Sequence, residues 1–207
     1  MVRFATRNVT GNGMTKTSNL RCLLDAIGKV VHGAQISTED KYRVSAALFN
    51  ISLQHANAIV VLIDSGLASS AFALVRPMFE TYVRASWIFN CAQGAVIERL
   101  VSEDEFKEKL PSMLRDLDGV RGLNGYLAHF GTNLSGLHSY THGGLRVIAQ
   151  NLTEKDIGQA FPDSEVANML KFASVISFLS FTGISELAGI VNEETIQEMY
   201  SLIESQS

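Results

Sequence analysis

The segment AFALVRPMFETYVRASWIFNCA, residues 71–92, constrains the fold more than any other part of the chain. Its apolar residues occur at helical spacing, but they lie on almost every side of the helix that they predict. A helix that is apolar on nearly all sides is stable in water only when neighbouring elements cover it. The sequence therefore predicts that this helix is packed inside a bundle of other helices.

The rest of the chain also carries apolar residues at helical spacing, and no stretch predicts a strand of convincing length. The sequence contains no internal repeat and no interdomain linker, and 207 residues are enough to bury one continuous core. We therefore expect an all-α fold, a single-domain helical bundle of about five to seven helices with long antiparallel helices at its centre. Residues 1–15 are predicted to be a flexible N-terminal segment, and residues 16–207 to form the domain.

Capping residues predict where several helices begin and end. Helices are expected at residues 18–33, 37–64, 67–93, from 102, at 133–142, from 162 and from 192. Ser37 is the predicted N-cap of the second helix, and Ser65 and Gly66 turn the chain after it. The motif Ser102-Glu-Asp-Glu105 predicts the start of a charged helix, which we expect Pro111 to kink or split.

Composition and charge limit the classes of function. Hydrophobic residues make up 46% of the chain and charged residues 18%, with a formal net charge of −4. Lysines and arginines are scattered singly, which argues against a dedicated nucleic-acid-binding face. The N-terminus lacks the apolar segment of a signal peptide, and the most apolar segment, Val175–Val191, is short and interrupted by polar residues. We therefore expect a cytoplasmic protein outside the membrane, with Cys22 and Cys91 as reduced core residues.

Three charged residues lie on one stripe of the apolar helix. Arg76, Glu80 and Arg84 are spaced by four residues, and Trp87 falls on the same face. Pro77, beside this stripe, either bends the helix or begins a new one. Glu80 can accept hydrogen bonds from both arginines, which leaves a surplus of one positive charge. The row is therefore either an internal ion network or a site in which an outside anion balances the charge.

The stretch GLHSYTHGG, residues 136–144, carries two histidines on one face of a short predicted helix. A zinc protease would need HExxH, and a serine follows His138 instead. A mixed metal site with Glu80 stays open, but we predict no metal. His142, in the last helical turn, is suited to a C-terminal cap, because a cation is favoured there. The alternative is acid–base chemistry, with His138 or His142 as the catalytic residue and Tyr140 as a hydrogen-bonding contact of the ligand.

The blocks LVRPMFETYVRASW and LHSYTHGG together resemble a pattern of uncharacterised bacterial all-helical proteins. In that pattern, an arginine–proline–x–x–glutamate helix is followed by a histidine before a glycine. Such proteins are distantly similar to the HEPN superfamily, helical bundles that are common in toxin–antitoxin and phage-defence systems. The resemblance spans about Leu67 to Gly144. It implies a dimeric bundle and, for the active members, a metal-independent ribonuclease.

The catalytic motif of that superfamily is not matched in this chain. The motif places a histidine a few residues after an arginine, whereas Arg121 precedes His129 by too many residues and Arg146 follows His142. No catalytic role is therefore carried over to a single residue. A ribonuclease site would have to be assembled across helices, from the arginine–glutamate row and the two histidines of the downstream stretch.

Three functions are compatible with these patterns, and whether the protein is an enzyme stays open. The first is the binding of a small anion or nucleotide-like ligand in an interior polar pocket. The residues of this pocket would be Arg76, Glu80, Arg84, Tyr140, His138 and His142. The second is a HEPN-like ribonuclease or toxin that acts on RNA in bacterial phage defence, and the third is a non-catalytic scaffold or partner-binding bundle. We expect a homodimer and no cofactor.

Overall fold

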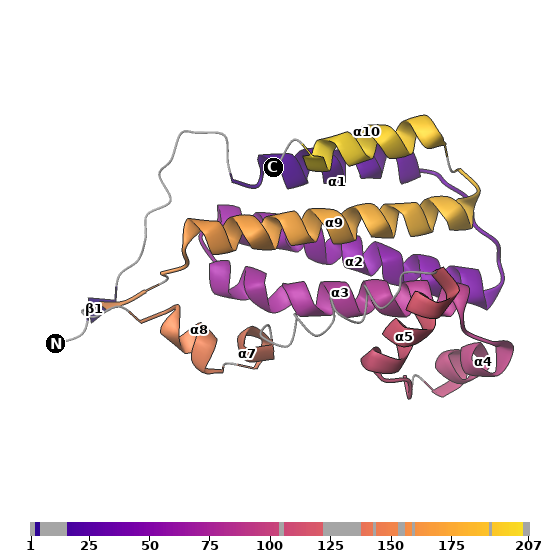
Figure 1. The fold of residues 1–207 in the computed structure, drawn as a ribbon, viewed down its shortest axis with the longest axis horizontal. Coiled ribbons are helices and arrows are strands. Elements are labelled where there is room, and N and C mark those ends of the chain that lie inside the picture. The colour runs from indigo at the N-terminus through magenta and orange to yellow at the C-terminus, as the bar shows by residue number, and fades with distance from the viewer. Residues whose placement is uncertain are drawn as a thin grey trace.

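The computed structural model describes residues 3–4, 16–103, 106–121, 138–142, 144–152, 156–158, 160–190 and 192–204, which form a bundle of helices (Figure 1). The predicted all-α helical bundle is thereby confirmed. The helices are α1 (Ser18–Val31), α2 (Asp40–Asp64), α3 (Ala68–Asn90), α4 (Gly94–Glu103), α5 (Leu110–Arg121), α7 (His138–Thr141), α8 (Leu145–Ala149), α9 (Asp163–Ala188) and α10 (Glu193–Glu204). Two-residue strands, β1 (Arg3–Phe4) and β2 (Asp156–Ile157), pair in parallel with Arg3 opposite Asp156.

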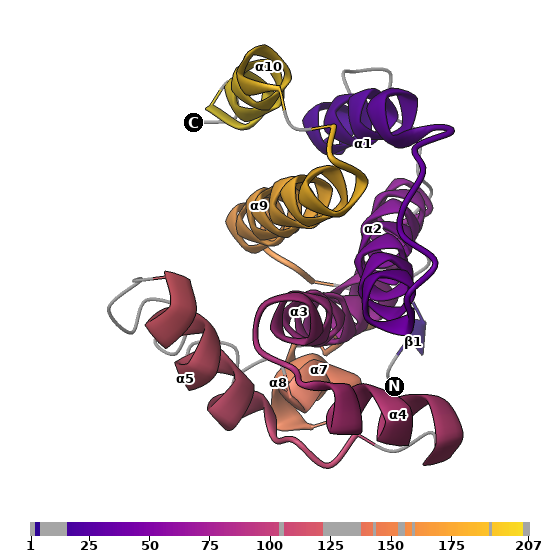
Figure 2. The same cartoon turned by 90° about the vertical axis from the view of Figure 1, so that its right-hand side faces the viewer.

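Three long helices form the centre of the bundle. α2, α3 and α9 contain 25, 23 and 26 residues. Figure 2 shows them as one group, with α1 and α10 on one side and α4, α5, α7 and α8 on the other. Successive residues of α2 contact α3 and α9 in reverse order, so both neighbours run antiparallel to α2. The prediction of long antiparallel central helices is confirmed.

The ring of Phe49 determines how closely α2 and α9 approach each other. Phe49 is 1% exposed, and its ring lies directly against Gly183 of α9. A Cβ atom at position 183 would be 2.3 Å from Phe49 Cζ, so the contact requires a residue without a side chain. The same ring packs against Tyr82 of α3, with 6.1 Å between the ring centroids. One side chain therefore links all three central helices.

Hydroxyl groups cross the same interface. Ser52 Oγ donates to the carbonyl of Met78 at 3.1 Å, and Ser180 Oγ donates to Ser52 Oγ at 3.3 Å. Both serines are 0% exposed. A buried hydroxyl without a partner is costly, so sliding any of the three helices along its axis would leave polar groups unsatisfied. The serines therefore specify the axial positions of α2, α3 and α9 more narrowly than apolar packing alone.

α3 continues through Pro77 as one helix, so the alternative that a new helix begins there is wrong. Pro77 has no N–H, and the carbonyl of Ala73 therefore loses its usual helical donor. Met78 and Phe79, which are 0% and 1% exposed, keep this part of the helix packed against its neighbours. Tertiary packing outweighs the loss of one backbone hydrogen bond.

One boundary of α2 is predicted correctly and the other is not. The helix ends at Asp64, and Gly66 takes a φ of 73° in the predicted turn, a conformation that glycine adopts without strain. Ser37 is not the N-cap, because the helix begins at Asp40 with Glu39 as its N-cap residue. The Ser37 hydroxyl instead accepts from the N–H of Glu39 at 3.3 Å. This serine therefore stabilises a turn before the helix.

The helix start predicted at residues 102–105 is also wrong. α4 ends there, and Ser102 Oγ donates to the carbonyl of Glu98 at 2.7 Å. The next helix begins at Leu110, and Pro111 lies in its first turn, where an N–H would have no intrahelical acceptor. Pro111 is therefore compatible with the start of α5, and it does not kink or split a longer helix.

Some predictions on the periphery of the bundle are corrected or stay open. Cys22 is exposed and Cys91 is half-buried, so Cys22 is not the core residue that was predicted, although both cysteines are free. Most of the predicted flexible segment, residues 1–15, lies outside the described residues. The predicted domain bounds therefore stay a prediction.

Two helices are long and apolar enough to cross a membrane by length and composition. The most apolar 18-residue windows of α2 and α9 have mean hydropathies of 1.6 and 1.3. Central helices of soluble bundles have the same composition, and half of the α9 window is buried in this chain. The prediction of a cytoplasmic protein outside the membrane stays a prediction.

We predict opposite effects for two glycine-to-alanine substitutions in helices. Gly183→Ala should lower the free energy of unfolding by about 1–3 kcal/mol, because the new methyl group overlaps the Phe49 ring. Gly28→Ala in α1 has open space around the new Cβ atom and should raise it by about 0.5–1 kcal/mol. Urea denaturation of both variants measures the difference. Equal stabilities of the two variants would contradict the close contact between α2 and α9.

Candidate functional site

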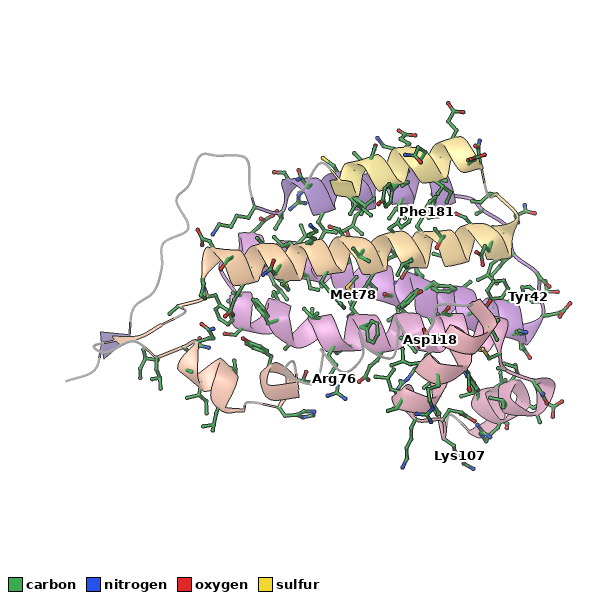
Figure 3. All side chains as sticks on the ribbon, viewed as in Figure 1. Tyr42, Arg76, Met78, Lys107, Asp118 and Phe181 are labelled. Atoms are coloured by element: carbon green, nitrogen blue, oxygen red, sulfur yellow. The ribbon has the colours of Figure 1, made fainter. Side chains whose placement is uncertain are left out.

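The predicted row of charges lies on the flank of α3 that faces away from α9, as Figure 3 shows for Arg76. We call Arg76, Glu80 and Arg84 the arginine strip. Arg76 Nε donates to Glu80 Oε1 at 2.7 Å, and these side chains are 33% and 23% exposed. Arg84 is also half-buried. The strip is therefore half-buried, and it lies apart from Met78, Phe79 and Tyr82, through which α3 contacts α2 and α9. The predicted interior pocket, which joins the strip to the histidines, stays a prediction.

An aromatic cluster flanks the strip on its N-terminal side. Tyr140 of α7 stacks on Phe72 of α3 with 5.0 Å between ring centroids, and Phe161 stacks on Phe72 at 4.9 Å. Phe72 lies one helical turn before Arg76, so α7 packs on the face of α3 that carries the strip. Tyr140 is 5% exposed and packs within this cluster. Its predicted contact with a ligand stays a prediction.

Helix α5 covers the same face of α3 on the C-terminal side of the strip. Trp87 Nε1 donates to Asp116 Oδ2 of α5 at 2.8 Å. A second carboxylate of α5, Asp118, is 8% exposed, has interactions of its own and lies where α5 crosses α3 (Figure 3). The arginine strip therefore lies along α3 between the contacts with α7 and those with α5.

Arg84 differs from Arg76 in having no carboxylate partner among the described residues. Its guanidinium carbon lies 5.0 Å from the centroid of the Phe106 ring. The Nε atom of Arg84 is buried and has no hydrogen-bond partner in the described part of the chain. An unsatisfied buried donor costs about 1–3 kcal/mol, of which the contact with an aromatic face returns part. Arg84 is thus the unbalanced charge of the strip.

Phe106 belongs to the α4–α5 connection, residues 106–109. Besides the contact of Phe106 with α3, this connection forms an ion pair with α4. Arg99 Nη2 donates to Glu108 Oε1, and the two side chains are 22% and 20% exposed. Burial raises the pKa of the Glu108 carboxyl, but the hydrogen bond from Arg99, backbone hydrogen bonds and the charge of Arg99 outweigh it. The pKa of Glu108 therefore lies below its ordinary value of 4.5.

The two predicted histidines are not both placed by the structure. His138 is the first residue of α7, and its side chain lies outside the described part. His142 follows α7 and is exposed. α7 contacts α3 at Phe72, which is about 12 Å along the helix axis from Glu80. α7 therefore lies beside the strip, but no described contact joins an imidazole to Glu80, and the catalytic role of the histidines stays a prediction.

The described residues contain no group of three or more histidine, cysteine, aspartate or glutamate side chains that could hold a metal ion. The charged row of α3 presents guanidinium groups, which bind oxyanions through hydrogen bonds and charge.

Sequence reasoning missed Phe106 and the Arg99–Glu108 ion pair. Phe106 is the only apolar residue in the stretch SEDEFKEK, residues 102–109. An isolated aromatic residue in such a charged stretch is a signal that it packs against another element. Its partner could not be identified, because Phe106 and Arg84 lie in different elements and no local spacing relates them.

The lowered pKa of Glu108 predicts a pH-dependent contribution to stability. The ionised carboxylate stabilises the fold above its ordinary pKa of 4.5, and this contribution is lost as the pH falls through the lower folded-state value. Glu108→Gln should therefore be less stable than the parent at pH 7, and the difference should shrink below pH 4.5. Urea denaturation across this range measures it, with Glu98→Gln, an exposed site on α4, as the control. A difference that does not change with pH would contradict the prediction.

Comparison with curated proteins and with solved structures gives no match. A family model described as "Family of unknown function (DUF6988)" matches residues 49–205. The matched range begins within α2 and includes the arginine strip, the α4–α5 connection, α7, α9 and the whole of α10. Because the match covers more than half of the chain, this protein belongs to the DUF6988 family of unknown function.

Proposed function

We propose that this protein binds a small oxyanion, or the anionic group of a nucleotide-like ligand, at the arginine strip. The observation that carries the proposal is the state of Arg84. Its guanidinium group is half-buried, its Nε atom has no hydrogen-bond partner in the described chain, and Phe106 covers part of it. A ligand oxyanion would supply the opposite charge that the described residues do not.

The charges around the strip support an anionic ligand. Glu80 forms an ion pair with Arg76 at 2.7 Å, so the one carboxylate of the strip already balances one of its two guanidinium groups. Asp116 is used by the indole N–H of Trp87 and is exposed, so solvent and salt screen its charge. The planar donors of a guanidinium group match the paired oxygens of phosphate, sulfate or carboxylate.

The outward face of α2 supports a location outside a membrane, and the predicted location in the cytoplasm stays a prediction. Exposed polar residues lie on this face at helical spacing, at Arg43, Asn50, Gln54 and Asn57, and the apolar Val61 follows them. A helix that contacts lipid would present apolar residues there, because hydrocarbon cannot hydrogen-bond to amide groups.

The predicted homodimer stays a prediction.

We predict that Arg84→Gln removes a stabilising effect of oxyanions. Phosphate or pyrophosphate should raise the melting temperature of the parent above that in sodium chloride of the same ionic strength, because a ligand that binds only the folded state stabilises it. A tenfold excess over Kd corresponds to about 1.4 kcal/mol. Thermal unfolding and calorimetric titration measure the effect.

Arg115→Gln is the matched control for this substitution, because Arg115 is an exposed arginine of α5 and its loss changes the net charge equally. Arg115→Gln should keep the response to phosphate. If the parent shows no response beyond that of chloride, the strip is an internal ion network and the scaffold interpretation is favoured. If both variants lose the response equally, only the net charge matters and the site is not at Arg84.

A second function, a metal-independent ribonuclease, is favoured by the position of α7. His142 is exposed next to a helix that packs on the same face of α3 as Arg76. An imidazole and a guanidinium group on one face could transfer a proton and bind a phosphodiester. The resemblance to the HEPN superfamily points to the same activity, in bacterial phage defence.

We predict for this second function that the protein cleaves RNA in the presence of EDTA and that His142→Ala reduces the rate about 100-fold or more, as expected for loss of a general acid or base. The control is His32→Ala, because His32 is an exposed histidine after α1. Gel analysis of a labelled RNA measures the rate. Equal rates for the parent and His142→Ala would exclude His142 from the mechanism.

A further inference from the structure

The α4–α5 connection, residues 106–109, contacts two different helices through alternate side chains. Phe106 and Glu108 are half-buried, whereas Lys107 and Lys109 are exposed. Figure 3 shows Lys107 on the outer side of the connection, away from α3. Alternation with a period of two is typical of an extended segment with one face against the protein. The inward face therefore consists of one aromatic ring and one carboxylate.

The two inward side chains each bind an arginine. The Phe106 ring lies under the guanidinium group of Arg84 on α3, with 5.0 Å from Cζ to the ring centroid. The carboxylate of Glu108 accepts from Arg99 on α4. Because Phe106 and Glu108 are two residues apart, their Cα atoms are within about 7 Å of each other. The Arg99–Glu108 ion pair therefore restrains the position of the Phe106 ring against α3.

The contact with Phe106 leaves donors of Arg84 that a ligand would use. An aromatic face attracts the guanidinium group through its charge and forms no conventional hydrogen bond with it. The Nε atom of Arg84 is buried, so the Nη atoms carry the remaining donors. The contact also restricts the rotamers of a side chain that is otherwise among the most flexible. A guanidinium group that is already oriented loses less entropy when an anion binds.

We infer that Phe106 and Glu108 are positioning residues of the anion site. Phe106 orients the guanidinium group of Arg84, and the Arg99–Glu108 ion pair holds Phe106 in place. The inference rests on the proposed function. It adds that the α4–α5 connection, which does not itself bind the ligand, partly determines the affinity for the anion. The same arrangement predicts which anions bind. The two Nη atoms of Arg84 lie in one plane and can donate to two oxygens of one anion, so the site should prefer phosphate over chloride.

The first measurement is the affinity of the full chain for phosphate by calorimetric titration. Phe106→Leu keeps apolar volume but removes the π face, and it should weaken phosphate binding about three- to tenfold through the lost preorganisation. Glu108→Gln should weaken it by a similar factor. The double variant should bind phosphate about as tightly as the single variant with the lower affinity, because both changes release the same contact. Lys109→Gln, which removes an exposed charge from the same connection, should change the affinity less than twofold.

The second measurement separates failure of this inference from failure of the proposed function. The Arg84 Nε–H signal in a ¹⁵N-resolved NMR spectrum should be shifted upfield by the ring and protected from exchange in the parent, and both properties should be lost in Phe106→Leu and in Glu108→Gln. If these signals change as expected but the parent does not bind phosphate, the positioning role holds and the proposed anion binding is wrong. If Phe106→Leu binds phosphate as the parent does, or if its Nε–H signal is unchanged, the positioning role is wrong.

Discussion

Because the ring of Phe49 lies against the backbone of Gly183, α2 and α9 approach each other closely, and Tyr82 brings α3 to the same ring. This packing decides which side of α3 is turned toward the core. Met78 and Phe79, which are almost fully buried, lie on that side or next to it. The other flank, with the arginine strip, is left for shorter elements to cover, so the position of the site follows from the packing of the central helices.

The arginine strip combines two different ways of accommodating a half-buried guanidinium group. Arg76 forms an ion pair with a carboxylate one turn away on the same helix, an arrangement that needs nothing from the rest of the fold. Arg84 relies on the Phe106 ring, which belongs to a connection that is itself attached to α4 by an ion pair. The charge of Arg76 is balanced within its own helix, whereas the charge of Arg84 is only partly compensated by the ring. An anionic ligand is therefore expected at Arg84.

The long helices could be predicted from the sequence because their apolar periodicity extends over many turns. The burial of Trp87 and the common face of Arg76 and Glu80 follow from the same periodicity. Local capping motifs were less informative. Ser102 has the spacing of a helix start, but a serine hydroxyl can equally bond back to the carbonyl four residues earlier within a helix, as it does here with Glu98. Which of the two occurs depends on where the apolar surface ends, and a four-residue motif does not contain that information.

The parts of the site that were not predicted are contacts between elements. No spacing rule relates Arg84 to Phe106, because several turns of two helices and a connection separate them along the chain. The extent to which the strip is buried also does not follow from the sequence, since a nearly uniform apolar helix predicts neighbours on several sides but not their lengths. Among the described contacts, α7 reaches α3 at Phe72 and α5 reaches it at Trp87, and between these two positions Arg76 and Glu80 are partly exposed.

The hydroxyl chain through Ser52 and Ser180 joins positions 128 residues apart in the chain. On the ribosome, α2 and α3 can pair as a hairpin long before α9 has been synthesised, because the turn that joins them is short. During that interval the Phe49 ring has no glycine to pack against, and the hydroxyl of Ser52 has only its bond to α3. The nascent hairpin therefore exposes an apolar surface for the time needed to translate the intervening segment.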